Sequence, residues 1–170
     1  LAKFSEMTLN VQAGELGNKL TLTEWKKVKT LSLSGHIDVR DFRFINKNLK
    51  YISKLDLSSV SISSYENCKA NYIPDEALYD FMILKKVLLP ESVETLGRSA
   101  FSNCKTNQIS FPDQIKEIKE NCFQYADFSG KMALPVKPPT MIHLRTPPPA
   151  APPAILPEFL STGNSFRKTA

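Results

Sequence analysis

The residues best suited to metal binding or acid–base catalysis are few and widely spaced. His36 and His143 are the only histidines, and neither has a cysteine or carboxylate at the spacing of metal ligands. A metal site needs three or four such groups to converge, so the sequence predicts none. Asp38 and Asp41 resemble a carboxylate pair, but a catalytic pair needs a pocket that shifts its pKa values. We expect instead that Asp41 caps a following helix.

The cysteines also lack the spacing of a reactive site. Cys68, Cys104 and Cys122 cannot all pair within one chain, and none belongs to a C-x-x-C motif. Cys104 and Cys122 align with alanines in the internal repeats described below, so both are predicted to be buried core residues. Cys68 is the thiol expected to be exposed. No Ser-His-Asp order, phosphate loop or nucleophile elbow is present, so we expect no catalytic residue, no cofactor and no enzyme activity.

Composition and charge narrow the class of protein further. The chain has 170 residues, of which 42% are apolar and 23% charged, as is typical of a soluble globular domain. No apolar run is long enough to cross a bilayer, so no transmembrane segment is expected. The net charge of +5 comes from lysines that are spread along the chain and not interleaved with aromatic residues, so nucleic acid is not an expected partner. The N-terminus lacks a signal-peptide pattern, which predicts a mature or trimmed product.

The sequence contains an internal repeat with an offset of 22 residues. The pattern of residues 87–96 reappears at residues 109–118, and that of residues 100–101 reappears at residues 122–123. Every position that is apolar in both copies falls in the same column, whereas the positions between them vary freely. Such a repeat indicates units that stack around a shared core.

Weaker copies of the repeat lie on both sides of this pair. They are at residues 31–37, 55–62 and 132–135. The interval from Leu55 to Val87 is 32 residues, so this unit carries an insertion, which we place at residues 58–72. The serine and asparagine content of the insertion predicts a surface loop.

Each repeat is predicted to form a strand followed by a return segment. An apolar-x-apolar tripeptide places two side chains on one face of an extended chain, so each repeat begins with a strand. Proline cannot donate a ladder hydrogen bond, so the strands are expected to end at Pro90, Pro112 and Pro135. The return segments 41–48, 75–82 and 98–102 are predicted to be short helices or single turns. The expected fold class is an α/β solenoid with parallel strands on one face and short helices or turns on the other.

The ends of the chain differ in composition from the repeats. The predicted regions are an N-terminal cap at residues 1–29, repeats at residues 30–136 and a proline-rich segment at residues 137–170. In the cap, Thr21 and Glu24 match a capping box, and Trp25 is expected to plug the first open core layer. The last region holds eight of the 12 prolines and is predicted to be extended or partly disordered, with one further strand at residues 141–144 as an option.

A specific motif spans residues 84–104. It reads Leu84-x-x-Val87-x-Leu89-Pro90-x-x-Val93-x-x-Leu96-Gly97-x-x-Ala100-Phe101-x-x-Cys104 and resembles the BspA-like leucine-rich repeat. The copy at residues 108–123 is similar, with Lys119 where the family has glycine and Cys122 where it has alanine. Residues 13–58 resemble the cap and first repeats of BspA-like surface proteins of anaerobic gut bacteria, and the resemblance extends over residues 11–135.

This resemblance implies a fold, a location and a kind of partner. The expected fold is a short right-handed leucine-rich-repeat coil with an N-terminal cap. The family members are exported and often lipid-anchored, so the resemblance implies an extracellular or cell-surface location, reached through an N-terminal signal that has been removed. The implied role is binding or adhesion to host or neighbouring-cell proteins, although a solenoid supplies a surface and not a particular chemistry.

The side chains that alternate with the core positions of the strands form the expected binding face. They are Ser32, Lys54, Asp56, Lys86, Leu88, Gln108 and Ser110. Leu88 is apolar among polar neighbours and is either a partner anchor or an ordinary exposed leucine. Lys54 and Lys86 form either a basic binding stripe or a solvated face. Two functions stay open, a binding or adhesion module and a structural spacer that displays other domains at the cell surface.

Overall fold

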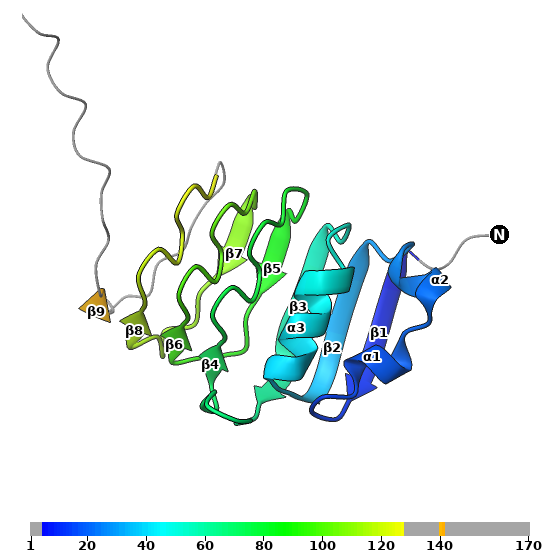
Figure 1. The fold of residues 1–170 in the computed structure, drawn as a ribbon, viewed down its shortest axis with the longest axis horizontal. Coiled ribbons are helices and arrows are strands. Elements are labelled where there is room, and N and C mark those ends of the chain that lie inside the picture. The colour runs from blue at the N-terminus through cyan, green and yellow to red at the C-terminus, as the bar shows by residue number, and fades with distance from the viewer. Residues whose placement is uncertain (1–4, 128–139, 142–170) are drawn as a thin grey trace, which may run out of the picture.

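The computed structural model describes residues 5–127 and 140–141, and its largest feature is a sheet of five parallel strands (Figure 1). The strands lie in the order β1-β2-β3-β5-β7. Their bounds are Glu6–Val11 (β1), Thr30–Ile37 (β2), Lys54–Ile62 (β3), Lys86–Leu88 (β5) and Gln108–Ser110 (β7). Leu55 pairs with Val87, and Val87 pairs with Ile109. The prediction that the apolar columns lie on adjacent parallel strands is therefore confirmed.

The same repeats form a second parallel sheet, which the sequence did not predict. Its order is β4-β6-β8-β9. The bounds are Tyr72–Ile73 (β4), Thr95–Leu96 (β6), Glu117–Ile118 (β8) and Thr140–Met141 (β9). A strand of two residues is too short to show a repeated alternation of apolar and polar side chains. In Thr95–Leu96, for example, the strand contributes a single buried residue, Leu96. With two parallel sheets and few helices, the chain has a solenoid-like α/β fold.

The described residues include three helices, and the longest covers the first repeats. The helices are Leu16–Lys19 (α1), Leu22–Trp25 (α2) and Val39–Asn48 (α3). The predicted helix at residues 41–48 is confirmed as α3, whose Phe42 and Ile45 are buried. The prediction that Asp41 is the cap is wrong, because Asp38 occupies the N-cap and accepts a hydrogen bond from the Arg40 backbone N–H at 2.8 Å. Asp41 completes a capping box from the third helical position.

The later return segments are turns and not helices. Each contains a pair of non-glycine residues with positive φ, a conformation that stops an α-helix. The pairs are Glu76 and Asp80, Ser99 and Asn103, and Asn121 and Tyr125. Backbone hydrogen bonds join these turns from one repeat to the next, as from the Phe101 N–H to the Cys122 carbonyl at 2.8 Å. Of the two alternatives predicted for these segments, the turn is therefore the correct one.

The insertion after β3 is shorter than predicted. We placed it at residues 58–72, but β3 continues to Ile62 and pairs with β2 up to Ile37. Val60 and Ile62 are buried in the core, and this burial keeps the serine-rich segment extended. The loop proper occupies residues 63–71 and contains an isolated bridge between Tyr65 and Cys68.

Buried apolar residues from both sheets and from the helices form one continuous core. Phe101 is fully buried and stacks on Phe123 with ring centroids 5.7 Å apart, and Phe111 packs edge-on against both rings. Cys104 and Cys122 are buried, as predicted.

The strand-ending prolines lie partly where we predicted them. Pro90 and Pro112 follow the ends of β5 and β7 and are buried. The predicted copy at residues 132–135, including its Pro135, lies outside the described residues.

The two ends of the chain are described in part. Thr21 and Glu24 form the predicted capping box, in which the Thr21 N–H donates to Glu24 Oε2 at 2.8 Å. Trp25 is half-buried and packs on Phe44 of α3, with ring centroids 5.3 Å apart. Within the region predicted as a cap, β1 pairs along its length with β2, the strand of the first repeat. The strand predicted at residues 141–144 is present as β9 at Thr140–Met141, and residues 142–144 lie outside the described residues.

Candidate functional site

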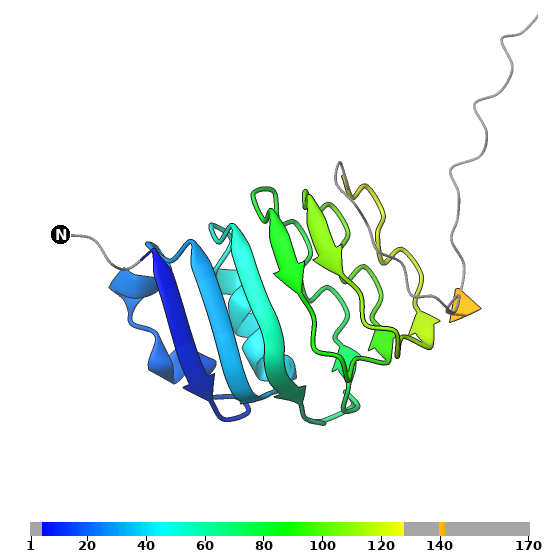
Figure 2. The same ribbon diagram turned by 180° about the vertical axis from the view of Figure 1, so that it is seen from behind.

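The seven residues predicted to form a binding face lie on β2, β3, β5 and β7, strands of the five-stranded sheet that Figure 2 shows from behind. Two rows cross the strands in register. One row is Thr30, Lys54, Lys86 and Gln108, and the other is Ser32, Asp56, Leu88 and Ser110. The strand register therefore aligns these positions across neighbouring strands, while their role as a binding face stays a prediction.

The chemistry of this face is that of an ordinary polar surface. Lys54 Nζ lies 3.8 Å from Asp56 Oδ2, and Asp56 also accepts a hydrogen bond from the Ser58 hydroxyl at 2.6 Å. Leu88 is half-buried, and its row neighbours Asp56 and Ser110 are polar. Without a larger apolar patch, the face offers no strong anchor for a partner.

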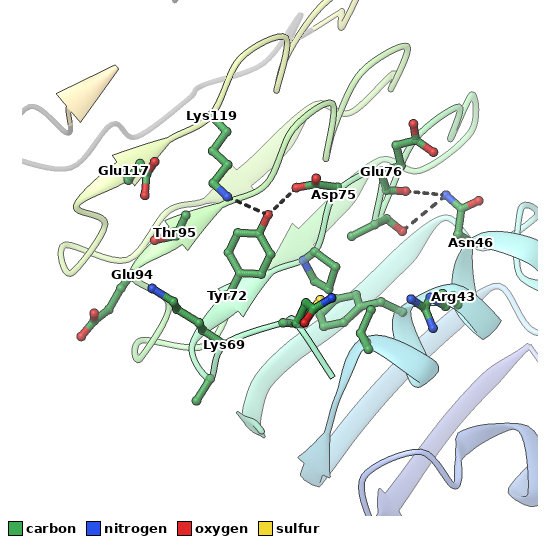
Figure 3. A pocket seen from close by; sticks show the side chains of 17 residues that line it. Arg43, Asn46, Lys69, Tyr72, Asp75, Glu76, Glu94, Thr95, Glu117 and Lys119 are labelled. Atoms are coloured by element: carbon green, nitrogen blue, oxygen red, sulfur yellow. Dashed lines mark hydrogen bonds between the residues drawn. The ribbon is translucent and has the colours of Figure 1, made fainter. Parts of the chain in front are cut away.

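A concave site that sequence reasoning missed lies along the second sheet. This groove has a volume of about 750 Å³ and is shown in Figure 3. Its walls are α3, the loop at residues 67–70 and the turn at residues 74–77, and its floor is the outer face of β4, β6 and β8. Such a volume is typical of ligand-binding pockets.

The floor of the groove is built from the outward side chains of the two-residue strands. Tyr72 pairs with Thr95, and Thr95 pairs with Glu117. The residue that follows each of them is buried in the core, which directs these three side chains outward. Aligned polar side chains at the spacing of neighbouring strands therefore line the groove.

Tyr72 is the centre of a hydrogen-bond network in the groove. Its hydroxyl donates to Asp75 Oδ1 and accepts a hydrogen bond from Lys119 Nζ at 3.4 Å, and that ammonium lies 4.8 Å from the Tyr72 ring centroid (Figure 3). Asp75 Oδ1 also accepts from the Arg98 backbone N–H at 2.9 Å. Burial raises the pKa of Tyr72, and its bond to Asp75 raises that pKa further. Tyr72 is therefore a neutral phenol that offers a ring face and a polar edge.

Lys119 reaches the groove because this copy departs from the repeat pattern. The equivalent residue one repeat earlier is Gly97, where an added Cβ would lie 2.6 Å from the backbone of Ile73 and Asp75. A side chain therefore cannot replace hydrogen at position 97 without a shift of the backbone. Position 119 carries a lysine, which extends over Tyr72.

The opposite wall is fixed to α3. Asn46 Nδ2 donates to the carbonyl oxygens of Glu76 at 3.0 Å and Tyr79 at 3.1 Å. Arg43 Nη2 lies 3.6 Å from Glu66 Oε2 in the loop on the same side. Side chains of α3 therefore hold both the turn and the loop that border the groove, and the site is preformed.

Two groups in the groove, Cys68 and Tyr72, have pKa values raised by burial. Cys68 lines the groove and is half-buried rather than exposed as predicted, and burial raises the pKa of its thiol. A thiol is a weak nucleophile, and a phenol with a raised pKa is a poor general base near neutral pH. The arrangement offers hydrogen-bonding and charged groups to a ligand.

The two aspartates near α3 are occupied by structural contacts. Burial would raise the pKa of Asp38, but hydrogen bonds from the side chain and backbone of Arg40 hold it below its usual value. Asp41 Oδ2 and Oδ1 accept from the Gly14 and Leu16 backbone N–H groups at 2.7 and 3.0 Å. Neither carboxylate lines the groove, and both make contacts that stabilise the fold.

Histidine and the other cysteines add no reactive centre to the described part of the chain. His36 is exposed on β2, and His143 lies outside the described residues. Burial raises the pKa values of Cys104 and Cys122 to about 12. Within residues 5–127 and 140–141, no three histidine, cysteine or carboxylate side chains lie together as metal ligands would.

One sequence signal pointed to the groove. Residues 72–74 align with residues 95–97 and 117–119, at offsets of 23 and 22 residues. This alignment would have identified a third copy of the second strand and placed Tyr72 in a column with Thr95. We missed it because we assigned residue 72 to the inserted loop.

Comparison with known sequences identifies a family of repeats. A model described as a BspA type leucine-rich repeat region, in six copies, matches residues 37–137, which is 101 of 170 residues. The search of curated proteins finds no match. No helix in the described part of the chain has the length and apolar character of a membrane span.

Proposed function

Because the chain belongs to the BspA-type leucine-rich-repeat family, we propose that it is an extracellular protein-binding module that uses the groove beside Tyr72. Leucine-rich repeats commonly mediate protein–protein interaction or adhesion. The observation that carries the proposal is the preformed concave site with a central aromatic ring and converging polar groups. The occupant is a short extended polypeptide segment of a host or neighbouring-cell protein.

The charges in the groove support an occupant that carries both signs. Cationic groups come from Arg43, Lys69 and Lys119, and anionic groups come from Asp75, Glu76, Glu94 and Glu117. A purely apolar ligand would desolvate these groups without replacing their hydrogen bonds, which is unfavourable. A polypeptide backbone with mixed side chains supplies both donors and acceptors.

We also propose the handedness of the coil, the roles of the three regions of the chain and the location of the protein. The coil is right-handed, as in most parallel crossover connections. Residues 1–29 act as the N-terminal cap, residues 30–136 as the repeats and residues 137–170 as a proline-rich segment. The location is extracellular or at the cell surface, where a lipid anchor would retain the protein. The support for this location is membership of the family.

We propose no catalytic activity for this chain. BspA-type leucine-rich repeats are a non-enzymatic family. The shifted groups in the groove, Tyr72 and Cys68, both have raised pKa values and stay protonated near neutral pH.

A spacer that holds other domains away from the cell surface is the second candidate function. The polar outer face of the five-stranded sheet favours the spacer. Among the seven residues predicted to bind, which lie in the rows through Lys54 and Asp56, Leu88 is the single apolar one. A spacer needs a polar surface and no binding site, so it gives no role to the groove.

Selection of peptides from a random displayed library on the immobilised chain tests the groove. We expect wild-type protein to enrich peptides and Thr95→Arg, which fills the groove, to weaken their binding by about tenfold or more. Ser110→Arg on the five-stranded sheet is the matched control and should change binding less than about twofold.

Two results would contradict the proposal that peptides bind in the groove. Peptides that lose binding with Leu88→Asp but keep it with Thr95→Arg would place the site on the five-stranded sheet. A selection that enriches no peptide would favour the spacer. Circular dichroism of each variant checks that it is folded.

A further inference from the structure

Lysines that are scattered along the sequence lie together at one edge of the folded chain. All strands of the five-stranded sheet are parallel, so the segments that enter them share an edge (Figure 1). We call seven lysines of these segments the basic ridge, which leaves out Lys50 because its Nζ donates to the Tyr79 carbonyl and lies over the Phe81 ring. The seven are Lys26, Lys27, Lys29, Lys54, Lys85, Lys86 and Lys105.

Backbone hydrogen bonds fix the ridge as a row along the solenoid axis. The Lys54 N–H donates to the Lys29 carbonyl at 3.1 Å, and the Gln108 N–H donates to the Lys85 carbonyl at 3.0 Å. The Lys85 N–H donates to the Ser53 carbonyl at 2.7 Å, which joins the two pairs. Neighbouring positions are therefore separated by the spacing of paired strands, about 4.8 Å.

The segments of the ridge contain no acidic residue. Residues 26–30, 49–55, 82–88 and 105–110 hold neither aspartate nor glutamate. Three carboxylates on the adjoining elements have partners within the fold: Asp56 pairs with Lys54, Glu24 accepts from Thr21, and Asp80 accepts from Asn103 at 2.6 Å. Glu6 at the start of β1 is exposed and pairs in register with Thr30, so it places one acidic side chain at the β1 end of the row. Asp127 forms an isolated β-bridge with Lys105 and places an acidic residue at the far end of the row.

Large apolar side chains are exposed at the same edge. Six large hydrophobic side chains are exposed among the described residues, and four of them belong to the segments that border the ridge. They are Leu22, Tyr51, Met82 and Ile83, with exposed fractions of 66%, 62%, 44% and 42%. Lys29 Nζ lies 5.8 Å from the Tyr51 ring centroid, so charge and apolar surface are interleaved.

We propose that the basic ridge binds an anionic lipid surface. Lysines near a charged bilayer are attracted to its headgroups, while exposed leucine, tyrosine, methionine and isoleucine side chains enter the interfacial layer. The combination of the two features favours a lipid surface over a soluble polyanion, since a soluble polyanion is bound by the lysines and leaves the apolar side chains in water.

This orientation leaves the groove accessible. Figure 1 shows α2 and the segments entering β5 and β7 along one edge of the molecule, whereas β4, β6 and β8 lie toward the opposite edge. A chain that rests on the ridge therefore presents the groove away from the lipid surface. The inference does not depend on the groove being a binding site.

Co-sedimentation of the chain with vesicles tests the proposal. We expect binding to vesicles made of equal parts of phosphatidylcholine and phosphatidylglycerol, little binding to phosphatidylcholine alone, and loss of binding at high salt. Lys85→Glu with Lys86→Glu should reduce vesicle affinity by about tenfold or more. The control, Lys19→Glu with Lys69→Glu, changes net charge equally and should stay within about twofold, because Lys19 lies on α1 and Lys69 lines the groove.

A second pair of measurements separates lipid from other polyanions. Met82→Ser with Ile83→Ser should weaken vesicle binding, and Ile83→Trp should show a blue-shifted emission on vesicles beyond that of Trp25 in the parent chain. Failure to bind anionic vesicles overturns the proposal. So does equal binding to dextran sulfate with no effect of the serine substitutions, which would make the ridge a soluble-polyanion or nucleic-acid site. Melting curves establish that each variant is folded.

Discussion

Asp41 is a buried carboxylate that joins the N-terminal segment to α3. Its oxygens accept hydrogen bonds from the backbone N–H groups of Gly14, Leu16 and Asp38, at 2.7 to 3.0 Å. A charged acceptor is well matched to several donors and compensates for the loss of solvent around a buried carboxylate. The residue that resembled part of a catalytic pair is therefore a structural connector.

Replacement of this carboxylate tests that role. Asp41→Asn places an amide NH₂ against backbone donors, and we expect the free energy of unfolding to fall by about 2–4 kcal/mol. Chemical denaturation measures the change. Asp113→Asn, at an exposed turn position, is the control and should change stability by less than about 0.5 kcal/mol. Equal stability of the two variants would show that the buried carboxylate is dispensable.

At the scale of elements, the repeats are joined on two sides. Strands pair in the five-stranded sheet, and the turns that follow them are linked by hydrogen bonds such as Leu78 N–H to the Ala100 carbonyl at 2.8 Å. Ser99 and Asn103 have positive φ angles, and this left-handed backbone conformation directs the N–H groups of the turn toward the next repeat. The same conformation explains why the apolar spacing after Pro74 does not continue into a helix.

Aromatic packing between repeats gives a prediction at this scale. Phe101 is fully buried, whereas Phe123 at the equivalent position is half-buried, so the two layers are not equal. We expect Phe101→Ala to lower the free energy of unfolding by about 3–5 kcal/mol and Phe123→Ala by about half as much. Denaturant unfolding curves measure both. Unchanged stability of Phe101→Ala would contradict the stacking of the repeats.

The repeat period made the first sheet predictable. Columns of apolar residues such as Val87 and Ile109 recur at one offset, and a stacked core is the arrangement that buries them together. The strand-ending prolines and the rows of the sheet face follow from the same register. The boundary of β3 was not predictable from composition, because the buried Val60 and Ile62 override a serine-rich local sequence.

The second sheet and the groove could not be predicted from local sequence patterns, because they form only in the complete fold. A strand such as Thr95–Leu96 is too short to show periodicity, and Tyr72 was hidden by the insertion that precedes it. The groove also needs α3, which is distant in sequence and contributes Arg43 and Asn46. The basic ridge needs the parallel order of all strands, since its lysines are scattered in sequence.

The basic ridge and the groove occupy different parts of the molecule. The segments of the ridge enter the strands at one edge of the five-stranded sheet (Figure 1), and the groove lies along the second sheet. The long five-stranded sheet connects them and is mainly polar on its outer face. We propose that the sheet supports two binding surfaces, the groove and the ridge.

Formation of a disulfide across the second sheet tests the central claim, which is that the return strands lie side by side and form the floor of the groove. In a Cys68→Ser background, Thr95→Cys with Glu117→Cys places two thiols on paired strands, at a distance that suits a disulfide. We expect mild oxidation to produce an intramolecular 95–117 disulfide, detected by mass spectrometry of peptides. Thr95→Cys with Ser110→Cys, on the other sheet, should not form a bond. Absence of the 95–117 bond, or equal bonding in both variants, would contradict the account.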